Sequence, residues 1–264
     1  MQKKQMPTFL FDKVVFGPVM SRRLGVSLGI NLLPVNKKIC SFDCIYCECG
    51  LNGELGDKKG QLPTRQEVKE ALNIKLQEML KDGLVPDVIT FAGNGEPTMH
   101  PDFEGIIDDT ISIRDKQCVK ARIAVLSNAS RIDRKEVFEA LLKVDDNIQK
   151  LDSGLLDTIL LLDKPNYPYN LKATINNLAA FKGKVIIQTM FVTGHVDDKL
   201  IDNTSEPDIE SWLKALAVIQ PSKVMIYTIE RDTPFNTLKK VSLQQLKDIA
   251  AKAEAKGFTV SVSG

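Results

Sequence analysis

The chain has 264 residues, of which 43% are hydrophobic and 26% are charged, and its 35 basic residues nearly balance its 34 acidic ones. This composition predicts a globular protein with a substantial core, built as one large α/β domain or two small ones. A net charge of +1 excludes the broad basic surface that a general binder of nucleic acid or anionic membrane would carry.

The cysteines point to a metal site in a reducing compartment. Four of the five cysteines lie between residues 40 and 49. An odd count and such clustering in a chain of this length do not suit a disulfide scaffold. The polar stretch Met1 to Thr8 lacks the apolar core of a secretory signal, and no apolar run approaches the roughly 18 residues of a membrane helix. We therefore expect a cytoplasmic protein that does not span a membrane.

The first expected elements are extended. Phe9 to Val19 reads as an edge strand that precedes the main fold, and Ser27 to Leu33 reads as a strand. The cysteine-rich segment comes next, followed by a connector rich in glycine and lysine at residues 50–60. Thr64 and Glu67 form a capping box, which predicts that a helix begins there and runs to Asp82-Gly83.

Beyond this helix, strands and helices alternate along the chain. Strands are expected at 87–92, 121–126, 148–151, 184–192, 223–229 and 258–262, and helices at 102–111, 134–142, 171–181, 207–219 and 242–256. Repeated strand–helix units predict a parallel sheet with helices outside it, either an open doubly wound sheet or a barrel. In both architectures ligands bind at the carboxyl ends of the strands.

The cysteine spacing narrows the kind of metal site. Cys40, Cys44 and Cys47 follow a C-x-x-x-C-x-x-C pattern after the strand that ends near Leu33. Thiolates are soft ligands that select zinc, copper(I) or iron–sulfur clusters. Three thiolates can hold three corners of a [4Fe–4S] cluster, which leaves the fourth iron open to another ligand.

Residues suited to a shared ligand stand at the ends of the predicted strands. These are Gly93, Asn94, Gly95 and Glu96 after one strand, Ser127 and Asn128 after the next, Lys150 at the end of a short strand, and Gln188 inside an apolar strand. Glycines let a backbone approach a ligand closely, and short polar side chains suit hydroxyl groups but also cap helices. Each residue alone has an equally good structural explanation. Their convergence on one edge of the sheet favours a binding site.

These motifs resemble a known family. The segments CSFDCIYC, GNGEPT and LSNAS resemble those of the radical S-adenosylmethionine superfamily. The segments GPVMSRRLGVSLGINLLP and IYTIERDTPF resemble a branch of iron–sulfur oxidoreductases akin to the wyosine tRNA-modifying enzymes. The resemblance implies an α/β fold, a partial (β/α)6-type TIM barrel with parallel strands and an extra N-terminal extended segment. We expect one radical SAM domain over residues 1–264, with residues 1–26 as an N-terminal extension and 27–264 as the core barrel.

The resemblance also implies roles for individual residues. The cluster ligands would be Cys40, Cys44 and Cys47, and S-adenosylmethionine would bind the open iron through its amine and carboxylate. The cofactor-binding residues would be Tyr46 through its backbone at the adenine, Gly93, Asn94, Gly95 and Glu96 through carbonyls at the amine, Ser127 or Asn128 at the ribose, Lys150 at the carboxylate, and Gln188. Asn94 stands where many members of the family carry glycine, which is tolerated if its φ permits.

The implied reaction is reductive cleavage of S-adenosylmethionine to a 5′-deoxyadenosyl radical, which abstracts a hydrogen atom from a substrate. An electron donor such as flavodoxin or ferredoxin would be a partner. The cofactors carry this chemistry, so no protein side chain is assigned as catalytic. The branch resemblance suggests a tRNA base as substrate, whereas the near-neutral charge and the lack of an added nucleic-acid domain argue against it.

Several alternatives stay open. The protein could be an activase of a glycyl-radical enzyme, an electron-transfer iron–sulfur protein, or a non-catalytic protein with a Cys₄ zinc site formed by Cys40, Cys44, Cys47 and Cys49. Zinc sites usually divide their ligands into two pairs across a loop, which these four do not. Cys49 reads as a bystander, although a role as a switchable fourth ligand stays open. The sequence assigns no role to His100 or His195.

Overall fold

The computed structural model describes residues 9–21, 24–53 and 60–264. Contacts divide these residues into two compact units. The N-terminal unit holds residues 10–21, 24–40 and 60–148, and the C-terminal unit holds residue 9, residues 41–53 and residues 149–264. The expected connector at 50–60 and the expected N-terminal extension lie partly outside the described residues. The single-domain assignment stays a prediction.

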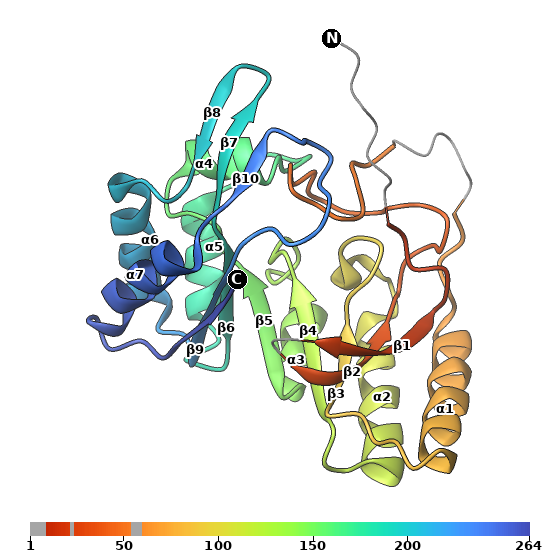
Figure 1. The fold of residues 1–264 in the computed structure, drawn as a ribbon. Helices are drawn as coiled ribbons and strands as arrows, with labels where there is room; N and C mark the ends of the chain where they lie inside the picture. The colour runs from red at the N-terminus through yellow and green to blue at the C-terminus, as the bar shows by residue number, and fades with distance from the viewer. Residues whose placement is uncertain (1–8, 22–23, 54–59) are drawn as a thin grey trace. The chain divides into compact units, whose positions relative to one another are not determined.

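The N-terminal unit alternates strands and helices after an antiparallel start (Figure 1). Its strands are β1 (Val15–Ser21), β2 (Gly25–Ile30), β3 (Val88–Phe91), β4 (Arg122–Ser127) and the start of β5 (Asp146–Lys150), and its helices are α1 (Arg65–Lys81), the 3₁₀ turn η1 (Pro97–Met99), α2 (Phe103–Gln117) and α3 (Lys135–Lys143). The strand order is β1-β2-β3-β4-β5. β1 pairs with β2 antiparallel, and β2 with β3 and β3 with β4 parallel.

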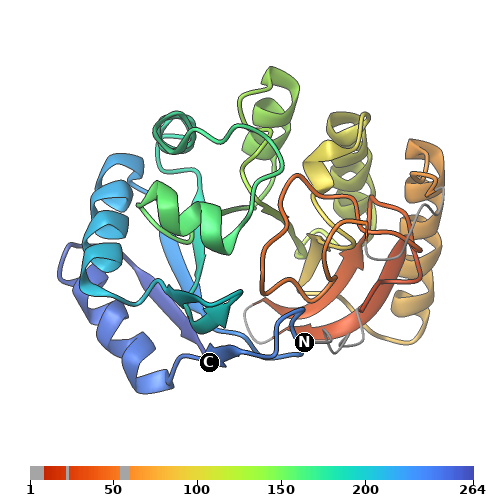
Figure 2. The same cartoon turned by 90° about the horizontal axis from the view of Figure 1, so that it is seen from above.

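Local sequence explains these elements. Every side chain of β3 is buried, which is expected for a strand covered on both faces in a parallel sheet. The predicted capping box of α1 is present, because the Thr64 hydroxyl accepts from the Glu67 N–H and the Glu67 carboxylate accepts from the Thr64 N–H. Helix α1 contacts β1 and α2, and α2 contacts α3. Figure 2 gives a second view of α1 and α2, in orange and yellow.

The C-terminal unit continues from the end of β5. Its remaining strands in this sheet are β6 (Ile186–Met190), β9 (Lys223–Tyr227) and β11 (Val260–Ser263), and its helices are α4 (Leu156–Leu162), α5 (Leu171–Ala179), α6 (Glu206–Ile219) and α7 (Leu243–Glu254). The strand order is β5-β6-β9-β11, and β6, β9 and β11 are paired parallel. The parallel strand–helix alternation expected from the sequence is therefore present in both units.

A second, three-stranded antiparallel sheet in the C-terminal unit was not expected. It consists of β7 (Val192–Val196), β8 (Lys199–Asp202) and β10 (Leu238–Lys240), in the order β10-β7-β8. The expected strand at 184–192 is in fact β6 followed by the first residue of β7. The β7–β8 turn is made by Asp197 and Asp198, both with positive φ, whereas the strong hairpin signals are Asn-Gly and Asp-Gly.

Helix lengths also differ from expectation. Helix α2 runs to Gln117 rather than ending near residue 111, and α4 was not predicted. Helix α4 has only 7 residues, too few to show a helical period. No helix among the described residues has the length and apolar character needed to cross a lipid bilayer.

Candidate functional site

The cysteine loop, defined as residues 40–49, is held by backbone hydrogen bonds to the last residue of α4 and to the segment after it. The N–H groups of Asp43 and Ile45 donate to the carbonyls of Asp163 and Leu162 at 3.0 and 2.9 Å. The Ser41 carbonyl accepts from the Asn166 N–H at 2.9 Å. All these residues belong to the C-terminal unit. The loop has no regular secondary structure, so these bonds fix its path.

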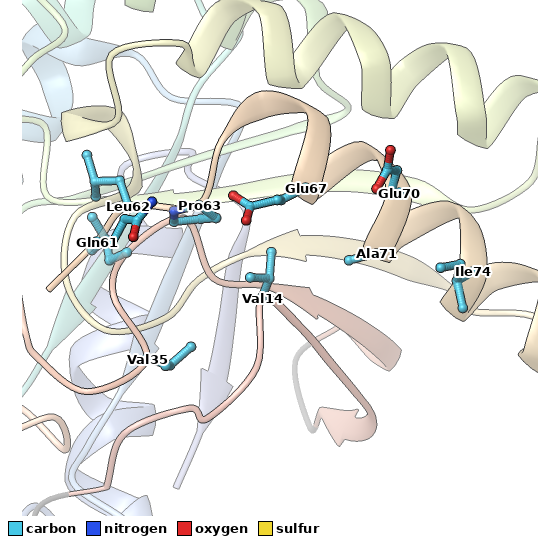
Figure 3. Close-up of a pocket in the computed structure, with 10 residues that line it drawn as sticks. Val14, Val35, Gln61, Leu62, Pro63, Glu67, Glu70, Ala71 and Ile74 are labelled. Carbon is cyan, nitrogen blue, oxygen red and sulfur yellow. The ribbon is translucent and has the colours of Figure 1, made fainter.

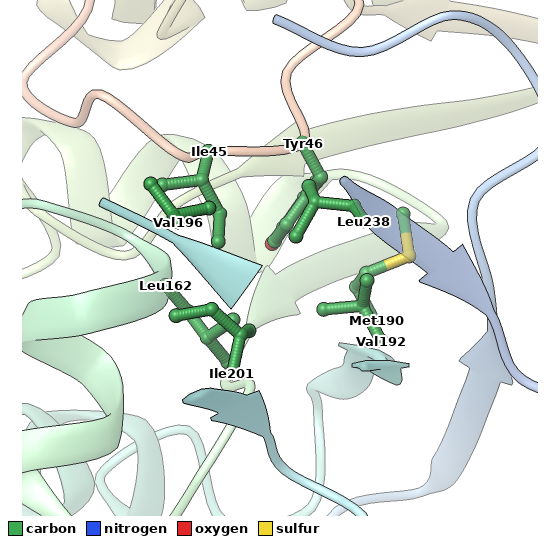
Figure 4. Close-up of a cluster of buried hydrophobic side chains, with 8 residues drawn as sticks. All are labelled: Ile45, Tyr46, Leu162, Met190, Val192, Val196, Ile201 and Leu238. Carbon is green, nitrogen blue, oxygen red and sulfur yellow. The ribbon is translucent and has the colours of Figure 1, made fainter. Parts of the chain in front are cut away.

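Two side chains of the cysteine loop enter a hydrophobic cluster (Figure 4). Ile45 and Tyr46 are buried with six residues from α4, the end of β6, and the sheet β10-β7-β8: Leu162, Met190, Val192, Val196, Ile201 and Leu238. Burial of large apolar side chains contributes about 1.5–3 kcal/mol each. The unexpected antiparallel sheet therefore has a role, since it supplies much of the surface on which the cysteine loop packs.

The thiols of the cysteine loop remain accessible. Cys40, Cys44, Cys47 and Cys49 are partly exposed, whereas Cys118 is buried in the N-terminal unit. Burial raises the pKa of the Cys118 thiol, which makes it a poor metal ligand because the thiolate is the binding form. Cys40 belongs to the N-terminal unit, and the other three cysteines of the loop belong to the C-terminal unit.

The glycine turn after β3 requires its two glycines. Gly95 has φ +135°, and a Cβ there would overlap the Ile39 carbonyl. A Cβ at Gly93 would overlap the Asn31 amide. The turn and Ile39 form an isolated parallel bridge in which the Ile39 N–H donates to the Asn94 carbonyl at 2.9 Å. The turn is thus pressed against the residue that precedes Cys40.

The Asn94 side chain is used for structure. It is fully buried, its Nδ2 donates to the carbonyls of Phe11 and Pro34 at 2.9 Å each, and its Oδ1 accepts from the Phe11 N–H at 2.8 Å. Asn94 is not among the residues of positive φ, so the departure from glycine at this position is tolerated. The carbonyls of Gly93, Asn94 and Glu96 each accept one main-chain hydrogen bond.

Glu96 links the glycine turn to the end of β4. Its carboxylate is buried and accepts from the Thr98 hydroxyl at 2.6 Å and from the Asn128 N–H at 2.6 Å. Burial raises the pKa of Glu96, opposed by hydrogen bonds from Thr98, Asn128 and Ser127. The Asn128 amide in turn lies 3.5 Å from the Cys40 sulfur. Four predicted site residues, Glu96, Ser127, Asn128 and Cys40, are therefore connected within the N-terminal unit.

Lys150 lies in a buried charge cluster, defined as Lys150, Asp152 and Asp163. Its ammonium forms ion pairs with both carboxylates, with a distance of 2.9 Å to Asp163. Burial would lower the pKa of Lys150, but the two aspartates outweigh that effect and raise it well above its ordinary value. Lys150 is thus a cation that two aspartates already pair with. The sequence instead predicted that Lys150 would pair with the carboxylate of the cofactor.

Asp163 makes the charge cluster sensitive to pH. Burial raises the pKa of its carboxyl to about 8, against the lowering effect of Lys150, while an unfolded aspartate titrates near about 4. A folded pKa above the unfolded one gives stability that is complete below about pH 4 and is lost as the pH rises through about 8. We expect the melting temperature of the wild type to fall between about pH 5 and 8 relative to that of Asp163→Asn, measured by circular dichroism. Parallel pH curves for the two proteins would contradict this account.

The remaining candidates have ordinary structural partners. Gln188 is buried in β6, and its carbonyl accepts from the Leu151 N–H at 3.0 Å. His100 is buried, with Nε2 2.7 Å from the Pro63 carbonyl and Nδ1 accepting from the Asp102 N–H. Nδ1 therefore carries the lone pair and Nε2 the proton. His195 is exposed on β7, and its carbonyl accepts from the Thr237 hydroxyl.

The N-terminal unit also carries a pocket of about 510 Å³ beside α1 (Figure 3). Its lining is mostly apolar, with Glu67 and Glu70 on α1 as its acidic residues. The Glu67 carboxylate is already used in the capping box of that helix. None of the residues predicted to bind cofactors lines this pocket.

Comparison with known proteins assigns this chain to a family. The sequence model described as "Radical SAM superfamily" matches residues 38–206, more than half of the chain. The chain belongs to the radical SAM superfamily. The prediction from the cysteine and glycine motifs is confirmed. Members of the superfamily bind a [4Fe–4S] cluster and S-adenosylmethionine, so these are the cofactors of this radical SAM protein.

Among curated relatives, the chain is 30% identical over 234 residues to a "UPF0026 protein" of Helicobacter pylori, covering 86% of this chain and 69% of that protein. It is 32% identical over 250 residues to a protein named "GTPase Obg" of Brachyspira hyodysenteriae, covering 93% of this chain. The radical SAM chain spans only 34% of that second relative's length.

Solved structures confirm the partial-barrel α/β fold. A radical SAM methyltransferase from Sphaerobacter thermophilus has a TM-score of 0.66 at 16% identity, covering 90% of this chain and 65% of that one. SuiB from Streptococcus suis, bound to S-adenosylmethionine, has a TM-score of 0.61 at 13% identity. The match covers 87% of this chain and 49% of SuiB. Archaeal TYW1 has a TM-score of 0.52 at 14% identity, and the match covers 87% of this chain and 71% of TYW1. At these identities the likeness concerns the fold.

Proposed function

We propose that this radical SAM protein is an enzyme in which Cys40, Cys44 and Cys47 hold the [4Fe–4S] cluster. The observation that carries the proposal is three partly exposed cysteines within eight residues, on a loop anchored by Ile45 and Tyr46. Three thiolates supply one ligand fewer than the cluster has irons. The donor set therefore suits a cluster that shares its fourth iron with S-adenosylmethionine.

The residues of the chain bind and orient this cofactor. The glycine turn Gly93 to Glu96 offers carbonyl lone pairs to the methionyl amine, and its glycines keep the backbone free of side chains. The Glu96 carboxylate, which is buried and accepts hydrogen bonds from Thr98 and Asn128, adds negative charge beside the same turn when it is ionised. Ser127 or Asn128 binds the ribose, and the backbone at Tyr46 meets the adenine. Gln188 is retained as a weaker contact. Because Lys150 is paired with two aspartates, we do not assign it to the cofactor carboxylate.

When bound and reduced, the cluster and S-adenosylmethionine supply a 5′-deoxyadenosyl radical that abstracts hydrogen from the substrate. The electron comes from a small donor protein such as flavodoxin or ferredoxin. Cysteines that hold an iron–sulfur cluster require a reducing compartment, which favours the cytoplasm. We assign no protein side chain as a general acid or base, because hydrogen-atom abstraction needs none.

Metal analysis tests the cluster assignment. Anaerobic reconstitution with iron and sulfide should load about four of each per chain. A zinc site is the alternative, and a tetrahedral zinc would need its thiolates within about 4 Å of one another. Among the described residues, no three His, Cys, Asp or Glu side chains are grouped in a way that suits a single ion. One zinc per chain and no capacity for iron would contradict the proposal.

The substrate we propose is a tRNA base. The segments GPVMSRRLGVSLGINLLP and IYTIERDTPF, which resemble wyosine tRNA-modifying enzymes, favour this substrate. The fold likeness to archaeal TYW1 is compatible with this assignment. The test compares modified nucleosides in tRNA from cells with and without the gene. We expect one modified nucleoside to disappear and its precursor to accumulate. Identical nucleoside profiles would overturn the tRNA assignment and leave the radical chemistry standing, with an activase of a glycyl-radical enzyme as the second candidate.

A further inference from the structure

The Tyr46 side chain connects the cysteine loop to the buried charge cluster. Its hydroxyl donates to the Asp152 carboxylate and lies 3.4 Å from Asp163 Oδ1. The Lys150 ammonium lies 4.5 Å from the centroid of the Tyr46 ring. Tyr46 stands between Cys44 and Cys47 in the sequence. One side chain of the loop is thus bound by every member of the charge cluster.

The charge cluster is itself fixed to the sheet and to the segment after α4. Asp152 accepts from the Met190 N–H at 2.9 Å, at the end of β6, and Lys150 is the last residue of β5. The Asp163 carbonyl accepts from the Asp43 N–H of the cysteine loop. Lys150, Asp152 and Asp163 are each at most 9% exposed. Hydrogen bonds to buried charged groups are about twice as strong as neutral ones, so the charge cluster is a rigid anchor.

We propose that Tyr46 is a positioning residue: its hydroxyl, which donates to Asp152 beside Lys150 and Asp163, fixes the Cys44–Cys47 segment in the geometry that binds the cluster. Lys150 then serves the cluster site through Tyr46 and does not bind S-adenosylmethionine directly.

An apolar aromatic residue at position 46 would fill the hydrophobic cluster equally well. A substitution of this kind therefore distinguishes the packing role of the ring from the positioning role of the hydroxyl. Phenylalanine keeps the ring beside Met190 and Leu238 and removes only the hydroxyl. If position 46 served packing alone, Tyr46→Phe would bind the cluster as the wild type does. If the hydroxyl positions the loop, the cluster will be bound in a less constrained loop and lost more readily.

The experiment measures iron loss from reconstituted holoprotein to a ferrous chelator, without S-adenosylmethionine. We expect Tyr46→Phe to lose iron on the order of tenfold faster than wild type, the scale of a hydrogen bond to a charged group. The control is Tyr169→Phe in the same unit, whose hydroxyl bonds to Thr174. The control should lose iron at the wild-type rate. Equal rates for wild type and Tyr46→Phe would overturn the proposal.

A double-mutant cycle assigns the effect to the hydrogen bond. Asp152→Asn should accelerate iron loss at least as much as Tyr46→Phe, because it loses the charged acceptor of the Tyr46 hydroxyl and also the ion pair with Lys150. The double variant should be no faster than Asp152→Asn, since the Tyr46–Asp152 hydrogen bond is already lost there. Multiplication of the two single effects would overturn the proposal. Circular dichroism of each apoprotein checks folding, and Asp152→Asn carries the test if Tyr46→Phe does not fold.

This inference rests on the proposed cluster ligands, and its failure can be told apart from theirs. If wild type takes up no iron–sulfur cluster, the proposed function has failed. If wild type takes up the cluster and Tyr46→Phe keeps it equally well, only the positioning role has failed. The electron paramagnetic resonance spectrum of the reduced cluster gives a second readout, since a displaced Cys44 or Cys47 changes the symmetry around its iron.

Discussion

Cys44→Ala should abolish both cluster binding and the cleavage of S-adenosylmethionine. Removing one of three thiolates leaves two corners of the cluster without protein ligands. The residues that follow it, Ile45 and Tyr46, carry no thiolate and are buried in the hydrophobic cluster. Iron content after anaerobic reconstitution and 5′-deoxyadenosine production under dithionite measure the two losses, and both should fall to the level of a protein-free control.

Cys49→Ala is the matched control, since it removes a partly exposed thiol from the same loop. It should retain the iron content and the 5′-deoxyadenosine yield of the wild type. A variant without Cys49 that fails to bind iron would make Cys49 a ligand and contradict the assignment of Cys40, Cys44 and Cys47. Full activity in Cys44→Ala would contradict it equally.

Gly95→Ala should strongly destabilise the glycine turn and disturb Cys40. The added Cβ would overlap the Ile39 carbonyl, and φ at this position is +135°, a conformation that L-residues rarely adopt. We expect the free energy of unfolding to fall by about 3 kcal/mol or more, measured by urea denaturation. Since Ile39 must move, the iron content of the reconstituted variant should fall as well.

Gly83→Ala controls for positive φ without a clash. Gly83 ends the helix α1 in the same unit with φ +72°, and nothing lies within 4 Å of the added Cβ. The variant should lose only about 1–2 kcal/mol and keep its iron. Equal losses of stability in the two variants would show that the contact between the glycine turn and Ile39 contributes nothing.

The periodicity of apolar residues in the sequence was sufficient to predict most strands and helices of the parallel sheet. Strands such as β3 and β4 are short apolar runs followed by turn residues, and helices such as α1 begin at a capping box. These features are local, so they can be recognised without knowledge of the tertiary structure. The sheet β10-β7-β8 could not be recognised in this way. Its strands are 3 to 5 residues long and are stabilised by packing against the cysteine loop.

The site was predictable where motif spacing defines it and not where burial defines it. The cysteine loop, the glycine turn and the end of β4 were identified from residue type and position. Asp163 was missed because no local pattern marks it: it follows a helix that was not predicted and acts through residues distant in sequence. Lys150 was identified as a site residue, but its two aspartate partners could be seen only in the folded chain.

The central claim is that three cysteines hold a cluster whose open iron binds S-adenosylmethionine for cleavage. The most direct measurement is the yield of 5′-deoxyadenosine from reconstituted wild-type protein, dithionite and S-adenosylmethionine under anaerobic conditions. The account predicts at least about one equivalent of 5′-deoxyadenosine per [4Fe–4S] cluster, because each cleavage needs one electron from one cluster. Protein that carries about four irons and four sulfides and yet forms no 5′-deoxyadenosine would contradict it.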